Sequence, residues 1–254
     1  MSNPLLNEER WSKLSRLDDV RSSTTMTMDG ALNKTLILIG LMVLTISAMW
    51  AKFWVGTTSM NAGSMMPWMI GGAIAGLVLV LVNVFAPRTA PVIAPLYAIC
   101  QGIFLGALTM ILEAQYPGLP ILAAVITIGV TMGLVMLYRS GIITVSNGFV
   151  KGVIGATIGV FIALAGLWLL SIFGIGTGVR SALYGNGLIG IGFSAVMVLL
   201  ATFNVVVDLK LIENGAARRA PKAMEWQGAF GLLITIVWLY VEILILLSKL
   251  RSRN

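Results

Sequence analysis

The sequence contains no histidine and only one cysteine, Cys100, among its 254 residues. Without histidine there is no Ser-His or Cys-His nucleophile system, and without Cys and His clusters there is neither a disulfide framework nor a zinc-type site. Histidine is also the side chain that ordinarily titrates near neutral pH, so any response to pH must come from carboxylates. These absences, together with the lack of a recognisable nucleophile, predict a protein that is not an enzyme and has no cofactor.

Charged residues are scarce as well. They make up 11% of the chain, whereas hydrophobic residues make up 58%, and soluble domains carry about 25% charged residues. The composition therefore predicts an integral membrane protein surrounded by lipid. The net charge of +7 does not indicate nucleic-acid binding, because the cations lie in loops between apolar runs, where they act as topology signals.

Seven apolar segments have the roughly 20 residues that a membrane-spanning helix needs. Proline or glycine marks nearly every boundary, and no alternating β-barrel pattern appears. We therefore predict an all-α integral membrane protein, a bundle of seven transmembrane helices at about 35–54, 67–86, 91–114, 119–138, 151–173, 187–212 and 226–248.

The first 33 residues are polar and of mixed charge, with no signal-peptide pattern. They predict a disordered cytosolic tail, with room for a short amphipathic helix around 11–17, ahead of a transmembrane domain at 34–250.

Lysine and arginine counts predict the orientation, because cytoplasmic loops are enriched in them. With a cytoplasmic N-terminus, ten of these residues lie inside and two, Lys52 and Arg180, lie outside. Seven crossings add Lys249, Arg251 and Arg253 to the outer side. Either the last helix ends outside, or it inserts partly and returns to the inner face.

Small residues recur at helical spacing in two of the predicted spans. Gly102, Gly106, Thr109 and Glu113 form one stripe, and a second consists of Gly152, Ala156, Gly159, Ala163 and Gly166. Such stripes let helices approach closely. Tight packing is the favoured interpretation, and the lining of a pore is the alternative.

Two acids, Asp208 and Glu242, lie inside the sixth and seventh apolar segments. A charge at the centre of a membrane helix costs about 2.5–3.5 kcal/mol, so such residues usually face a protein interior or a water-filled cavity. We expect them to face each other, to titrate as a unit and to bind a cation, with Asn204 and Thr235 as polar neighbours. A purely structural hydrogen-bonded clamp is the alternative.

Two further charged residues are candidates. Arg88, after the second span, is either a positive-inside charge or a latch that reaches the acidic pair. Glu113, near the outer end of the third span, is either a solvated carboxylate or a cation site at an outer mouth.

Two motifs suggest an enzyme, but neither has the sequence context that its function requires. The glycines of GNGLIG at 185–190 match a dinucleotide fingerprint but lack the strand and βαβ unit that it requires. An aspartyl intramembrane protease is disfavoured because valines, not a Gly-x-Gly, precede Asp208.

Three stretches carry a family resemblance: PVIAPLYA at 91–98 with Gly102, VVVDLKLIENG at 205–215, and WLYVEILILLSKL at 238–250. Over about residues 33–250 the chain resembles the Bax inhibitor family, also called the TMBIM or YccA-like family. The resemblance implies a seven-helix fold and a pH-sensitive calcium leak controlled by two acids, to which Asp208 and Glu242 correspond, with Arg88 as the latch. The family's second acid is an aspartate, and here it is glutamate.

The resulting hypothesis is a cation leak, for calcium, in a bacterial inner membrane, gated by protonation of Asp208 and Glu242. Two rivals remain. One is a membrane-embedded modulator of a membrane protease or another protein complex, and the other is a proton-coupled transporter, for which no inverted repeat is visible.

Overall fold

The structure is a computed structural model, and it describes residues 25–54 and 62–253. Within this part of the chain, seven helices are long and apolar enough to cross a membrane. This confirms the predicted all-α bundle and its seven spans. They are α2 (Met28–Phe53), α3 (Ala62–Phe85), α4 (Ala90–Gln115), α5 (Leu119–Arg139), α6 (Asn147–Ile172), α8 (Leu188–Ala217) and α9 (Met224–Arg251).

Two short helices connect the long ones. The 3₁₀ turn η1 (Pro87–Thr89) links α3 to α4, and the eight-residue α7 (Thr177–Tyr184) precedes α8. Helix α7 lies between the predicted spans 151–173 and 187–212, where eight residues are too few for a helical pattern to stand out in the sequence.

The first helix begins earlier than predicted. Thr27 caps α2 by accepting a hydrogen bond from the backbone N–H of Gly30, so the helix starts at Met28 rather than near residue 35. Met26 and Ala31 are buried. Helix α2 therefore begins before the predicted domain boundary at residue 34. The helix suggested around 11–17 lies outside the described residues.

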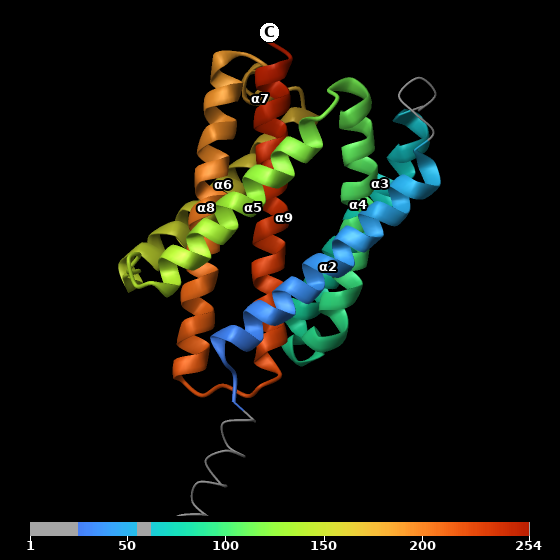
Figure 1. The fold of residues 1–254 in the computed structure, drawn as a ribbon. Helices are drawn as coiled ribbons and strands as arrows, with labels where there is room; N and C mark the ends of the chain where they lie inside the picture. The colour runs from blue at the N-terminus through green and yellow to red at the C-terminus, as the bar shows by residue number, and fades with distance from the viewer. Residues whose placement is uncertain (1–24, 55–61, 254) are drawn as a thin grey trace, which may run out of the picture.

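Helix α9 is the centre of the bundle and packs against α2, α4, α5 and α8 (Figure 1). It is one continuous helix from Met224 to Arg251. Its first turn lies at the end of the bundle where α2 starts, and its last turn lies at the opposite end (Figure 1). We call these the basic end and the Arg251 end. The unbroken helix favours the alternative in which the last span ends at the opposite face.

The two stripes of small residues differ in how closely neighbouring helices approach them. On α4, a Cβ added at Gly102 would lie 2.5 Å from Thr45 Cβ, and one at Gly106 would lie 2.9 Å from Met49 Cβ. This confirms close packing of α4 on α2. On α6, Gly152, Gly159 and Gly166 have no such neighbour within 4 Å. That stripe faces outward in the described chain, so it is neither a packing seam nor a pore lining.

Candidate functional site

Asp208 lies on α8 and is half-buried against α9. Its carboxylate accepts a hydrogen bond of 2.5 Å from the hydroxyl of Thr235, whose residue is 8% exposed. Among the described residues Asp208 has no ion pair. Lys210, the nearest cation along α8, pairs with Glu213 at 2.7 Å instead. The carboxylate of Asp208 therefore has a neutral partner only.

Glu242 lies on α9 and accepts a hydrogen bond of 3.0 Å from the indole N–H of Trp238, one turn earlier. The Trp238 ring contacts Phe161 of α6, with ring centroids 5.5 Å apart. Glu242 thus faces the side of α9 that is turned toward α6 and α8, again beside a neutral donor.

Asp208 and Glu242 were predicted to face each other, but in the described chain each carboxylate accepts its hydrogen bond from another residue, Thr235 or Trp238. Thr235, the partner of Asp208, is seven residues before Glu242, which is about 10 Å along the axis of a helix. The connection between the helices explains this offset. Asp208 is nine residues from the end of α8, whereas Glu242 is eighteen residues from the start of α9. The acids therefore lie at different depths.

Asn204 does not support Asp208 directly. Its amide donates to the Thr157 hydroxyl on α6 and to the Leu200 carbonyl, both at 2.8 Å. It therefore holds α6 against α8 one turn away from Asp208. Thr235, in contrast, is confirmed as a polar neighbour of the carboxylate.

Arg88 lies on η1 with an exposed side chain and forms no ion pair within the described residues. The predicted contact with the acids is absent from this arrangement. Glu113 accepts two hydrogen bonds, at 2.9 and 3.0 Å, from the backbone N–H of Gly118, whose φ is +80°. Its carboxylate therefore closes the turn between α4 and α5.

Lys249 continues the line of polar residues along α9. It is only 4% exposed, and its ammonium donates to the carbonyls of Leu183 at 2.9 Å and Gly190 at 3.0 Å. Thr235, Glu242 and Lys249 are spaced by seven residues, so they share one face of the helix. We call these three residues the α9 polar stripe.

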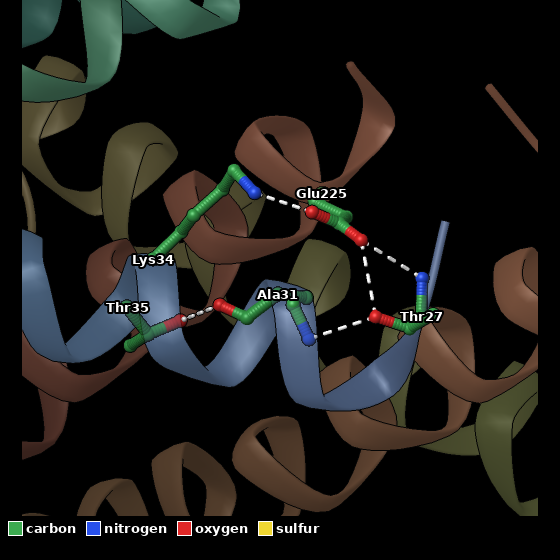
Figure 2. A network of polar contacts seen from close by, with 6 residues as sticks. Thr27, Ala31, Lys34, Thr35 and Glu225 are labelled. Carbon is green, nitrogen blue, oxygen red and sulfur yellow. Dashed lines mark hydrogen bonds and ion pairs between the residues drawn. The ribbon is translucent and has the colours of Figure 1, made fainter. Parts of the chain in front are cut away.

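A second charged cluster lies at the basic end, and sequence reasoning missed it. Glu225, in the first turn of α9, is 1% exposed and forms an ion pair with Lys34 of α2. Its other oxygen accepts hydrogen bonds from the backbone N–H of Thr27 at 3.0 Å and from the Thr27 hydroxyl at 3.1 Å. Figure 2 shows the Glu225 carboxylate between Lys34 and Thr27. We call Thr27, Gly30, Lys34 and Glu225 the Glu225 clasp.

The clasp depends on the absence of a side chain at residue 30. A Cβ on Gly30 would lie 2.2 Å from a Glu225 oxygen, which leaves no room for one. The Lys34 ammonium also lies 5.6 Å from the centre of the Trp226 ring. The only sequence signal for this cluster was an acid in a first helical turn, which is usually a solvated position that favours the helix dipole.

The segment before α2 adds backbone contacts to this end. The N–H of Met26 donates to the Ala220 carbonyl at 2.7 Å. Thr25 and Pro221 form an isolated antiparallel β-bridge. These contacts join the start of α2 to the connection between α8 and α9.

Within the described residues, no group of three or more acidic, Cys or His side chains could hold a metal ion. Calcium normally takes six to eight oxygen ligands. A single carboxylate beside one hydroxyl, as at Asp208, offers far fewer oxygen ligands than that.

The seven apolar helices, with ionisable side chains placed between them, define an integral membrane protein of the all-helical class. The sequence model of the family described as Bax inhibitor 1 like matches residues 3–252, so the chain belongs to that family. Comparison with characterised proteins and with solved structures gives no match.

Proposed function

We propose that the protein is a pH-sensitive cation leak, with calcium among its ions, whose path follows the seam between α8 and the α9 polar stripe. The observation that carries the proposal is the carboxylate of Asp208, which has a hydroxyl partner and forms no ion pair within the described residues. An ionised carboxylate among packed membrane helices is costly without a counter-charge. A passing cation or a proton would supply that charge.

The response to pH follows from the same competition. At neutral pH the ionised carboxylates of Asp208 and Glu242 attract a cation, and on acidification the proton replaces it. Cation flux is therefore higher at neutral than at acidic pH. Because the acids are offset along the path, each titrates beside its own partner, Thr235 or Trp238.

The orientation belongs to the same proposal. We place the basic end in the cytoplasm of a bacterial inner membrane. Of the Lys and Arg residues in the described chain, eight lie at or near the basic end and five at the Arg251 end. The positive-inside rule favours this arrangement.

The test is calcium flux into dye-loaded liposomes at acidic and neutral pH. We expect Asp208→Asn and Glu242→Gln each to lower the neutral flux, by on the order of tenfold for the loss of one charge in a low-dielectric path. Asp208→Asn should also flatten the pH profile. Glu113→Gln is the control, because its amide oxygen can still accept from Gly118.

An unchanged pH profile in both variants would refute the role of these acids. If the folded native protein gives no flux above that of empty liposomes, the leak itself is refuted. The rival interpretation, a modulator of a membrane protease or another complex, would then be tested by co-purification of the full chain with its partner.

A further inference from the structure

Lys249 is placed unlike the other cations at the Arg251 end. Arg251 and Arg253 are exposed, as is usual for long basic side chains at a membrane boundary, which extend toward water. Lys249 is 4% exposed and turns its ammonium between α7 and α8. A charge that served only as a topology signal would not need to be buried.

The atoms around this ammonium are those that would receive a mobile cation. Leu183 belongs to the last turn of α7, where carbonyls lack partners within the helix. The second acceptor is the carbonyl of Gly190, in the first turn of α8. A tight turn sets this pair of oxygens, since a Cβ on Gly190 would lie 1.9 Å from the Gly185 carbonyl oxygen.

Lys249 also lies in line with the acids. It is two helical turns beyond Glu242 on the α9 polar stripe, at about 10 Å along the axis. An ion that passes Glu242 along this face therefore meets the ammonium at the Arg251 end of the stripe.

We propose that Lys249 is a tethered cation that closes the Arg251 end of the path and selects against divalent ions. This inference rests on the proposed leak. A fixed positive charge repels a divalent ion twice as strongly as a monovalent ion at the same distance. Lys249 therefore slows calcium more than potassium, which keeps the calcium flux at the level of a leak.

The experiment measures calcium and potassium fluxes in liposomes for the native protein, Lys249→Gln and Lys249→Met. Glutamine keeps hydrogen-bond donors for the Leu183 and Gly190 carbonyls but removes the charge, whereas methionine removes both. We expect both variants to raise calcium flux by roughly tenfold, and to raise the ratio of calcium to potassium flux. Lys249→Arg keeps the charge and should keep the native ratio.

The matched control is Lys52→Gln, which removes an exposed lysine at the same end of the bundle and should leave the ratio unchanged. A native ratio in Lys249→Gln, alongside measurable native flux, would overturn the role of Lys249 while the leak stands. If the folded native protein gives no flux above that of empty liposomes, the leak is overturned, and this inference with it.

Discussion

Glu225 and Asp208 are both acids among packed helices, yet their surroundings differ in one respect. Glu225 has the Lys34 ammonium beside it and two hydrogen bonds from Thr27. Among residues 25–54 and 62–253, Asp208 has the Thr235 hydroxyl as its side-chain partner and no ion pair. A carboxylate with a fixed counter-charge has little to gain from a mobile cation, whereas one without it does. This difference supports the proposed ion-responsive role of Asp208 and suits Glu225 to a structural role.

The structural role predicts a large effect of Lys34→Met. The substitution leaves the Glu225 carboxylate buried without a cation, which should lower the free energy of unfolding by about 3–5 kcal/mol. Asp29→Asn is the control, because it breaks the exposed ion pair with Arg139 and should cost no more than about 1 kcal/mol. Denaturation of the purified protein in detergent measures both.

A double variant checks the mechanism of that loss. Lys34→Met combined with Glu225→Gln removes both charges, so stability should partly return relative to Lys34→Met alone. Equal costs for Lys34→Met and Asp29→Asn would contradict the clasp.

These residues also show which parts of the site could be predicted from the sequence. Asp208, Thr235 and Glu242 could be found because polar side chains stand out in apolar segments. The distance between the two acids could have been predicted by counting residues from the connection between α8 and α9. The Glu225 clasp could not have been predicted, because Lys34 is 191 residues away from its partner in the sequence. Glu225 also lies at a helix position where solvated acids are common.

At the scale of helices, contacts between backbones decide which glycines matter. On α3, a Cβ at Gly72 would lie 2.8 Å from both the Cys100 carbonyl oxygen and the Phe104 backbone nitrogen of α4. The adjacent Gly71 has nothing within 4 Å. Spacing alone does not distinguish such positions, which explains why the stripes on α4 and α6 had opposite outcomes.

We expect Gly72→Ala to force α3 and α4 apart, because backbone atoms cannot rotate away as side chains can. The cost should be on the order of 1–3 kcal/mol. Gly71→Ala meets open space and should be neutral or slightly stabilising, since alanine favours a helix over glycine by up to about 1 kcal/mol. Thermal unfolding in detergent compares the two variants, and equal melting temperatures would contradict the close contact.

At the scale of the whole molecule, the number of crossings decides where the chain ends. Seven spans require opposite faces for the start of α2 and the end of α9, and α9 passes through the bundle without a break. The charges at 249–253 oppose the positive-inside rule. Part of this conflict disappears because Lys249 is buried and bonded to carbonyls, so it is not free to act as a loop charge.

This topology predicts which introduced cysteines can be labelled from each side of the membrane. In a Cys100→Ser background, Lys222→Cys marks the basic end and Arg253→Cys the Arg251 end, and both native side chains are exposed. A membrane-impermeant thiol reagent added to intact spheroplasts should label Arg253→Cys and leave Lys222→Cys unlabelled until the membrane is opened. Lys52→Cys should behave like Arg253→Cys, because α2 ends at the same face. Labelling of both Lys222→Cys and Arg253→Cys from the same side would contradict seven crossings. If Lys222→Cys were labelled in intact spheroplasts and Arg253→Cys were not, the fold would stand and only the proposed orientation would be reversed.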